Sequence, residues 1–437
     1  MSVLETMKPS SLWRRAVLTR AAASSLVVVA NMEAEDDWNA GRPGLPAIAG
    51  GRRGDIVRRM DELGVWLAAE QDVVVVSKEP DPAFVRYLRD RGLFEGKLIW
   101  LAPDKRVASL LSDSDLARRV DSGAALLPMG NTKAIEALGA ALSLPVAAPA
   151  VALSARVNAK TYSQELCNRL EVPRPKSFSS HSLGELRARL TDIFRDVSKV
   201  CVKESLGVSG RGIVTLDSPA AGDRLLRMLS KQHGEDDLID FVVEEWIENA
   251  LDLNYQLLVD ETGEVKVLGL RSSEVIRGVH QGHRYPVRPE ATHLEGLAKH
   301  GRSIAAALND EGYFGVVGLD ALSTPEGQLY PCLEINARLN MSTFQNRIID
   351  EHVPQNGAAQ FFFVRPPATA PDDFSWYEKR LRTVLLRRGD ERGVIVMAHA
   401  TVASQGGDRR LYLATVGRDH KDAQMLRDLV AELLEIS

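Results

Sequence analysis

The chain has 437 residues, of which 45% are hydrophobic and 26% are charged, as in an ordinary globular protein of two to four domains. Its formal net charge of −5 gives no reason to expect nucleic acid as a partner. The three cysteines, Cys167, Cys201 and Cys332, are far apart and odd in number. This usage fits a reducing cytosol and excludes a disulfide framework or a cysteine-rich zinc site.

The N-terminal region contains Arg14-Arg15 followed by the apolar stretch Ala21–Ala30, which resembles an export signal. No small-x-small cleavage site with a clean mature start follows it. The run Leu26–Ala30 is short and β-branched, so it predicts a buried first strand. Nowhere is an uncharged apolar stretch long enough to span a bilayer. We therefore expect a cytoplasmic protein without a membrane partner.

Residues 1–150 alternate strand-like and helix-like segments. This alternation predicts a Rossmann-like domain, a small parallel sheet with helices on its faces. No GxGxxG motif follows the first strand, so a dinucleotide-binding function has little support. The expected strands are Leu26–Ala30, Val73–Ser77 and Leu98–Leu101, and the expected helices are Gly54–Ala69 and Asp81–Arg91.

The rest of the chain predicts two further domains, so the expected fold class is multidomain α/β and α+β. Residues 151–365 open with a helix over Val151–Leu170 and continue mostly as strands, with helices at Ala220–Gln232 and Thr292–Leu308. The stretch Pro366–Pro371 reads as a linker. Residues 374–437 then form a small α+β domain with strands at Gly393–Thr401 and Arg410–Thr415 and a helix at Asp419–Leu434.

The segment Lys199–Leu216 combines a strand, a glycine-rich loop and a second strand. A Walker-type loop requires a helix directly after its glycines, and the lysine of a protein kinase lies on a later strand. The remaining interpretation is a hairpin flap whose backbone N–H groups cover phosphates, with Lys203 as a point charge. Taken alone, the pattern fits a mobile surface hairpin equally well.

The strand-like run Phe241–Ile247 leads into paired acids followed by Trp and Ile. Such an edge can accept an adenine, with Glu244 taking the exocyclic amine and Asp252 binding ribose hydroxyls. The alternative is a solvated acid pair at the end of a strand.

The run Glu334–Arg338 ends a predicted hairpin that starts near Asp320 and turns at Thr324–Gly327. Alternation places Glu334, Asn336 and Arg338 on one face. Two carboxylates and an amide that converge require a positive partner, and such oxygen ligands suit Mg²⁺ with phosphate. We predict a magnesium site that holds a nucleoside triphosphate; the alternative is a solvated surface turn.

Taken in order, these motifs resemble the ATP-grasp superfamily, over about residues 151 to 345. The last motif reads Asn-Ala-Arg where many members have Asn-Pro-Arg, which affects loop stiffness more than chemistry. The resemblance implies ATP and Mg²⁺ as cofactors, with Arg338 and Lys203 as catalytic residues and Asp320, Glu334 and Asn336 as metal ligands. It further implies nucleotide-binding roles for Lys160, Lys203, Gly207, Ser209, Gly210, Gly212, Glu244, Glu245, Trp246, Ile247 and Asp252.

The resemblance also implies a carboxylate–amine ligase that works through an acyl-phosphate. The three-part architecture is similar to that of the peptide ligases of pheganomycin biosynthesis, which use a guanidino-containing amino acid. The expected reaction therefore joins an amino-acid-type carboxylate to the amine of an amino acid or peptide, in antibiotic biosynthesis. Two alternatives remain: amino-acid loading of a carrier protein, and a nucleotide-binding regulator without catalysis. A homodimer is compatible with the sequence.

Substrate residues are expected in Arg271–Pro286, which lies between the adenine edge and the metal hairpin and is rich in hydrogen-bonding side chains. Arg271 is suited to clamp a substrate carboxylate, and Glu274 to bind a guanidinium. The histidines of this segment lack the spacing of a metal site and also fit plain loop residues. Further substrate candidates are Arg277, His280 and Asn340.

Overall fold

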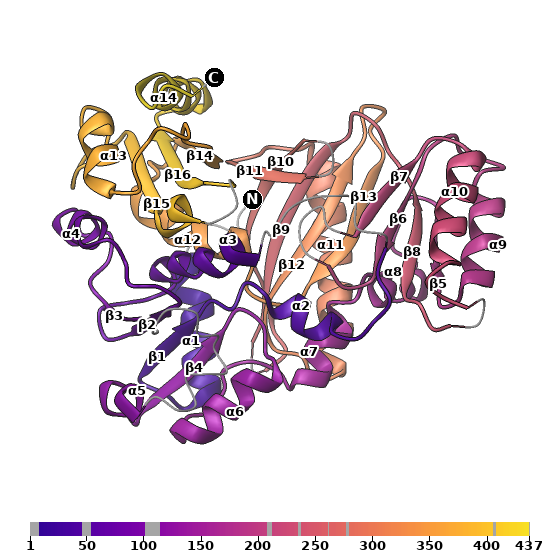
Figure 1. The fold of residues 1–437 in the computed structure, drawn as a ribbon, viewed down its shortest axis with the longest axis horizontal. Coiled ribbons are helices and arrows are strands. Elements are labelled where there is room, and N and C mark those ends of the chain that lie inside the picture. The colour runs from indigo at the N-terminus through magenta and orange to yellow at the C-terminus, as the bar shows by residue number, and fades with distance from the viewer. Residues whose placement is uncertain are drawn as a thin grey trace.

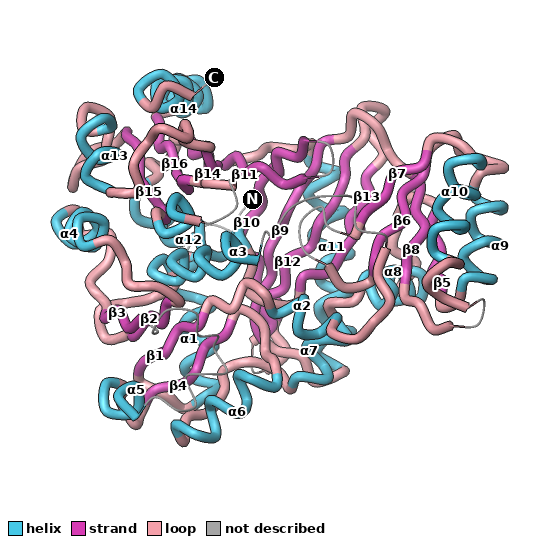
Figure 2. The backbone as a smooth tube through the Cα atoms, viewed as in Figure 1, coloured by secondary structure: helices cyan, strands magenta, loops and turns pink. Residues whose placement is uncertain are grey.

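The computed structural model describes residues 8–45, 54–100, 114–207, 212–234, 237–260, 262–276, 279–404 and 408–436. The described residues form three β-sheets with helices packed on their faces (Figures 1 and 2). The mixture of one parallel and two antiparallel sheets confirms the predicted α/β and α+β fold class. None of the described helices is both long enough and apolar enough to cross a membrane.

The first sheet is parallel, with strand order β3-β2-β1-β4. Strands β1 and β2 are fully buried because helices cover the sheet, which explains their unbroken valine-rich sequences. The strands are β1 Ser25–Val29, β2 Val73–Val76, β3 Lys97–Trp100 and β4 Ala124–Pro128. The helices of this region are α1 Pro9–Ala21, α2 Ala34–Asn39, α3 Gly54–Arg59, the 3₁₀ helix η1 Met60–Trp66, α4 Pro82–Asp90, α5 Ser114–Arg119 and α6 Lys133–Leu142.

The three strands predicted for this part are confirmed within a residue or two. The helix predicted over residues 54–69 is instead the short α3 followed by η1. Six of the seven residues of η1 are buried, so packing rather than an amphipathic pattern sets its conformation.

The second sheet has eight antiparallel strands in the order β13-β12-β9-β10-β11-β14-β16-β15. Its strands are β9 Leu251–Val259, β10 Val265–Ile276, β11 Val279–Tyr285, β12 Gly315–Ser323, β13 Leu329–Asn336, β14 Ala358–Val364, β15 Gly393–Ala398 and β16 Leu411–Gly417. Five further helical segments belong to this half of the chain: α11 Ala291–Asp310, α12 Met341–His352, α13 Phe374–Leu381, η3 Ala400–Ala403 and α14 His420–Leu433.

This sheet runs without a break across the stretch predicted as a linker. Strand β14, which precedes that stretch, pairs with β11 on one side and with β16 on the other. The C-terminal strands also contact the front part of the chain, since Trp66 donates a hydrogen bond from its indole to the carbonyl of Met397 at 2.9 Å. The C-terminal strands therefore extend the central sheet at one end and contact the front part of the chain.

The third sheet is antiparallel, in the order β5-β8-β6-β7, and α9 and α10 cover it at the right of Figure 1. Leucines from both helices meet Val202 and Phe241 in its core. Strands β6 and β7 pair directly, which confirms the predicted strand–loop–strand arrangement around the glycines. The elements are β5 Ser177–Ser180, α9 Leu183–Ile193, β6 Val200–Glu204, β7 Ile213–Leu216, α10 Pro219–Leu229 and β8 Phe241–Glu245.

The helix predicted over residues 151–170 is two helices, α7 Val151–Val157 and α8 Lys160–Arg169. They break at Asn158, whose side-chain amide donates to the carbonyls of Ser154 at 2.7 Å and Ala337 at 3.1 Å. The second of these bonds ties the helix break to the Glu334–Arg338 run. Lys160 consequently begins a new helix beside that run.

Candidate active site

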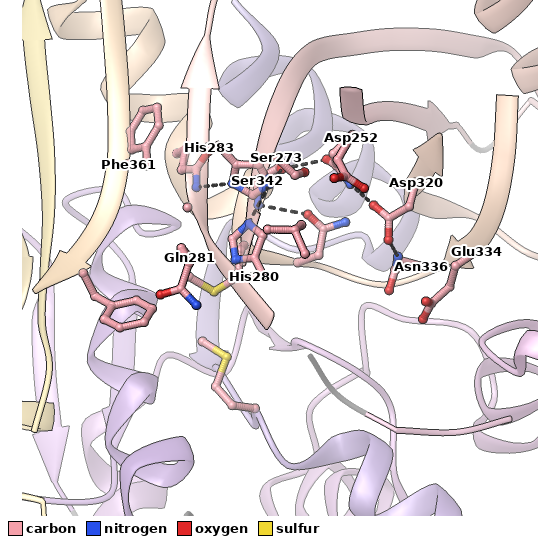
Figure 3. Close-up of a pocket in the computed structure, with 18 of the residues that line it drawn as sticks. Asp252, Ser273, His280, Gln281, His283, Asp320, Glu334, Asn336, Ser342 and Phe361 are labelled. Carbon is pink, nitrogen blue, oxygen red and sulfur yellow. Dashed lines mark hydrogen bonds between the residues drawn. The ribbon is translucent and has the colours of Figure 1, made fainter. Parts of the chain in front are cut away.

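One cavity, of about 360 Å³, lies between the second and third sheets and the front part of the chain, and half of the predicted site residues line it. Carboxylates and amides line one end of it, and Phe361 lies at the other, with His280 and His283 between them (Figure 3). The cavity is lined by side chains from the front, central and C-terminal parts of the chain.

The predicted metal hairpin is formed by β12 and β13, with Asp320 directly opposite Glu334. Both Asp320 oxygens accept hydrogen bonds, from Asn254 at 2.7 Å and from Asn336 at 3.0 Å. Burial, followed by the like charge of Glu334, raises the pKa of Asp320 to about 6. Glu334, Asn336 and Arg338 all line the cavity, while Ile335 and Ala337 are buried in the core on the other face, as alternation predicted.

Two lysines lie beside this hairpin, as predicted. The Lys160 ammonium, which is largely buried, pairs with Glu334 at 3.0 Å and donates to the carbonyl of Gly207 at 3.1 Å. Lys203 lines the same cavity from β6 and pairs with Glu244. Burial opposes the charge of Lys203, but Glu244 outweighs it and raises the pKa of that lysine. Two cations therefore face the place where phosphates are expected.

Glu244 does not line the cavity in the way expected for an adenine-binding carboxylate. Its buried carboxylate accepts from Lys203 and, at 2.8 Å, from Arg174. Burial raises the pKa of Glu244, but these two cations lower it below its ordinary value. Both oxygens are thus engaged within the protein, and the position of Lys203 depends on this ion pair.

The other members of the predicted adenine edge, Glu245, Trp246 and Ile247, are half-buried at and beyond the end of β8. None of the three is among the residues that line the cavity. Asp252, at the start of β9, does line it, and burial raises the pKa of this carboxyl to about 6. The assigned roles of these residues in nucleotide binding remain predictions.

The glycine-rich loop is described only at its two ends. Gly207 lines the cavity, and Gly212 adopts a φ of +66° at the start of β7. The predicted contacts at Ser209 and Gly210 lie outside the described residues.

Arg338, predicted to lie nearest the chemistry, forms an ion pair that the sequence did not suggest. Its Nε donates to Oε1 of Glu35 at 2.9 Å, and a second guanidinium nitrogen reaches the same oxygen. Glu35 is buried on α2 of the front part. Burial alone raises the pKa of Glu35, but Arg338, Lys160 and a hydrogen bond from the backbone of Gly207 bring it below its ordinary value.

Two predicted substrate residues face away from the cavity. Arg271 is 1% exposed and donates to Asn346 of α12, while its Nε and Nη1 have no partner. Glu274 is paired with Arg427 of α14 at 2.6 and 3.1 Å. Neither side chain lines the cavity, and both are engaged within the protein, so their predicted contacts with substrate stay predictions. Helices far along the chain cover both positions. Arg277 lies outside the described residues.

His280 and His283 lie on β11, in a hairpin with β10, and not in a loop. Both imidazoles line the cavity, with their Nε2 atoms 3.2 Å apart. Gln345 reaches Nδ1 of His283 at 2.8 Å, and Ser342 reaches its Nε2 at 3.3 Å. Burial lowers the pKa of His280 to about 4 and holds that of His283 well below its usual range. Both side chains are therefore neutral at pH 7.

Asn340, also predicted as a substrate residue, lines the cavity and caps α12 through its side chain. Its Oδ1 accepts from Gln256 at 2.7 Å, and its Nδ2 is buried without a partner. Among the residues described, no group of three His, Cys, Asp or Glu side chains forms a metal cluster. The hairpin offers two carboxylates and an amide, the small donor set that Mg²⁺ accepts when phosphate and water complete its shell.

Several residues that line the cavity or hold its lining side chains were missed by sequence reasoning. Glu35 lies about 300 positions from its partner Arg338, so no local pattern links the two. Asn254 alternates on β9 with buried apolar residues, a signal that points to a polar side chain facing a site. The apolar wall of the cavity could not be predicted, because in the sequence an apolar residue at a site looks the same as a core residue. This wall includes Met32, Met60, Met397 and Tyr412.

Comparison with known proteins agrees with this geometry. A family model described as a Pre ATP-grasp domain matches residues 60–144. The [butirosin acyl-carrier protein]–L-glutamate ligase of Niallia circulans is 23% identical over 344 residues, 78% of each chain. The biotin carboxylase domain of 2-oxoglutarate carboxylase from Hydrogenobacter thermophilus, solved with MgADP, ADP and bicarbonate, aligns with a TM-score of 0.58 and 17% identity over 95% of this chain and 91% of that one.

The chain has the ATP-grasp fold. Carboxyaminoimidazole ribonucleotide synthase from Aspergillus clavatus, solved with ATP, shares this ATP-grasp fold at a TM-score of 0.54 and 13% identity, covering 85% of this chain and 99% of that one. The fold and the match over residues 60–144 agree with the resemblance predicted from the sequence, and the roles assigned to the motifs from Lys160 to Arg338 stay predictions. The narrower resemblance to the pheganomycin peptide ligases stays a prediction.

Proposed function

We propose that this chain is an ATP- and Mg²⁺-dependent ligase that joins a carboxylate to an amine. The observation that carries the proposal is the convergence of Asp320, Glu334 and Asn336 with two lysines and Arg338 at one end of a single cavity. A nucleoside triphosphate with its metal ion would account for carboxylates and cations that face the same space. The remaining length of the cavity has room for an organic substrate.

The charges of Asp320 and Glu334 indicate that these residues, with Asn336, suit a Mg²⁺ ion. The pKa of Asp320 is raised to about 6 by burial and by the charge of Glu334, which is the state of a carboxylate that lacks a cation. Asp320, Glu334 and Asn336 would hold the ion, and the bound ion would neutralise charge on the phosphates of ATP. Lys160 and Lys203, from two different elements, would contact the same phosphates.

The chemistry that we infer begins with attack of the substrate carboxylate on the terminal phosphorus of ATP, which releases ADP. The amine then attacks the acyl-phosphate carbon, and phosphate leaves as the amide bond forms. Arg338 lies where charge on the transferred phosphoryl group needs stabilisation, and Glu35 fixes its orientation. Most of the protein's contribution is therefore positioning and charge stabilisation.

The finer assignment is a peptide ligase that joins an amino acid to an amino acid or peptide in antibiotic biosynthesis. The relative from Niallia circulans, named for its action on an acyl-carrier protein and L-glutamate, makes carrier-protein loading the second candidate. Both use the same activated carboxylate and differ in the acceptor. Both take small-molecule amino acids, and neither requires nucleic acid; a homodimer and a cytoplasmic location remain predictions.

Release of ADP in the presence of candidate amino acids tests the proposal. Amino-acid-dependent ADP release, with a new amide or thioester in the mass spectrum of the products, is the expected result. An amide product indicates peptide ligation, and an acylated carrier indicates loading. ATP turnover that stays at background with every carboxylate and acceptor would favour a non-catalytic nucleotide-binding regulator.

A further inference from the structure

The cavity continues beyond the metal hairpin into a part that we call the apolar extension. It is lined by Met32, Met60, Phe361, Phe363, Met397 and Tyr412. Met32, Phe361 and Met397 are each at most 4% exposed, so the wall is dry and packed. The rings of Phe363 and Tyr412 pack in a tilted arrangement, with their centroids 5.7 Å apart. In Figure 3, Phe361 lies at the opposite end of the cavity from Asp320 and Glu334.

The apolar extension starts close to the reactive end. Met129, another residue of the cavity wall, accepts a hydrogen bond at its carbonyl from the N–H of Leu339 at 3.1 Å. Leu339 directly follows Arg338, so the apolar wall begins next to the guanidinium assigned to the transferred phosphate. A carboxylate that reaches this guanidinium would direct the rest of its molecule along the extension.

The described part of the apolar extension offers no unneutralised charge. Its one described cation, Arg410, forms a bidentate pair with Asp408 at 2.8 and 3.2 Å and lies over the ring of Phe363 at 4.3 Å. The neighbouring imidazoles of His280 and His283 bond to one another and to Gln345, and both are neutral. A charged group that entered would lose its hydration without gaining a counter-charge.

On the basis of the proposed ligase function, we propose that the apolar extension binds the uncharged, apolar side chain of the amino acid whose carboxylate is activated. Linear aliphatic, thioether and aromatic side chains fit this wall, because methionine side chains adapt to different shapes and aromatic rings supply large contact area. The assignment differs from the guanidino-containing amino acid expected from the sequence. It also differs from the L-glutamate in the name of the Niallia circulans relative.

The test uses the whole protein with ATP, Mg²⁺ and hydroxylamine, which intercepts an acyl-phosphate as a hydroxamate without knowledge of the natural amine. L-methionine is compared with L-glutamate, which has nearly the same length, and L-phenylalanine and L-leucine with L-arginine. We expect kcat/KM for the apolar acids to exceed that for the charged acids by at least about tenfold. Faster hydroxamate formation with glutamate or arginine would overturn the proposal and leave the ligase function standing.

A pair of variants locates the effect in the apolar extension. Met60 is half-buried in the wall, and its sulfur accepts from the hydroxyl of Tyr412 at 3.3 Å. Met60→Arg places a cation there, so KM for the apolar acid should rise about tenfold or more while KM for ATP stays within about twofold. Met60→Leu should retain apolar substrates. Met228→Arg, on the exposed face of α10 outside the cavity, is the matched control.

Direct binding separates failure of this inference from failure of the proposed function. Calorimetric titration of L-methionine and L-glutamate into the protein with a non-hydrolysable ATP analogue and Mg²⁺ should show tighter binding of L-methionine. Such binding without hydroxamate would overturn the ligase function and support the subsite. Equal binding of the two acids, or an unchanged KM in Met60→Arg, would overturn the subsite.

Discussion

The two ends of the cavity are built in different ways. Asp320, Glu334 and Asn336 come from one hairpin of the central sheet, and backbone pairing fixes their spacing. The apolar extension draws Met60 from η1 and Met397 from β15, which are more than 300 residues apart and meet only through packing. The contrast indicates that nucleotide chemistry resides in short, rigid motifs, whereas substrate choice depends on how distant parts assemble.

The largest effect is expected at the hairpin. Glu334→Gln keeps the shape but removes one charge of the metal site and the partner of Lys160, so kcat should fall on the order of 10²–10³-fold or more. Turnover is measured by ADP release, and melting temperature checks that the fold is retained. Glu326→Gln, in the exposed turn of the same hairpin, is the control. Unchanged activity in Glu334→Gln would remove the metal assignment.

The second effect concerns the ion pair between Glu35 of the front part and Arg338 at the polar end of the cavity. Glu35→Gln removes the charge that holds Arg338, so kcat should fall about 10- to 100-fold through misplacement of the guanidinium, with little change in KM for ATP. Glu35→Gln should add little further loss to Arg338→Ala in the double variant, because Glu35 acts through the guanidinium that Arg338→Ala removes. Fully additive losses would contradict this coupling. Glu70→Gln, at an exposed position, is the matched control.

The assembly of the apolar extension is tested by the pH dependence of stability. Glu62 of η1 accepts hydrogen bonds from the backbone N–H groups of His399 and Ala400, which hold η1 against the end of β15. Burial raises the pKa of Glu62 from 4.5 to about 7. Between pH 4.5 and about 7, Glu62 is therefore protonated in the folded chain and ionised in the unfolded chain. Stability should fall as pH rises through this window toward and past 7.

The expected loss from pH 5 to 8 is on the order of 1–3 kcal/mol. Denaturant unfolding of the wild type and of Glu62→Gln at several pH values measures it. In the variant, the free energy of unfolding should fall less between pH 5 and 8 than in the wild type. The same fall in the two proteins would contradict the assignment to Glu62.

The smallest effect is expected at Glu274. Because its carboxylate pairs with Arg427, Glu274→Gln should lower the free energy of unfolding by about 1 kcal/mol and leave KM for the amino acid nearly unchanged. Arg427→Gln should behave in the same way. A large rise in KM limited to Glu274→Gln would instead support the role in substrate binding predicted from the sequence.

Much of the polar end was predictable because its determinants are local. Strand alternation and a turn at Gly327 suffice to place Asp320 opposite Glu334 and to aim Asn336 and Arg338 the same way. The surroundings of Arg271 and Glu274 could not be predicted from the sequence, for the opposite reason. Their surroundings come from α12 and α14, about 75 and 150 residues later, and nothing in the segment itself indicates them.

The sequence by itself determined the fold class, the strand–loop–strand around the glycines, and the hairpin that gathers the acidic residues. Periodicity and turn composition act over a few residues, so they can be read without a structure. Only the tertiary structure decided that Glu35 holds Arg338, that Glu244 is occupied by two cations, and that methionines and aromatic residues from three parts of the chain line one cavity. These relations arise from packing between elements distant in sequence, and apolar packing carries no motif because it is non-directional.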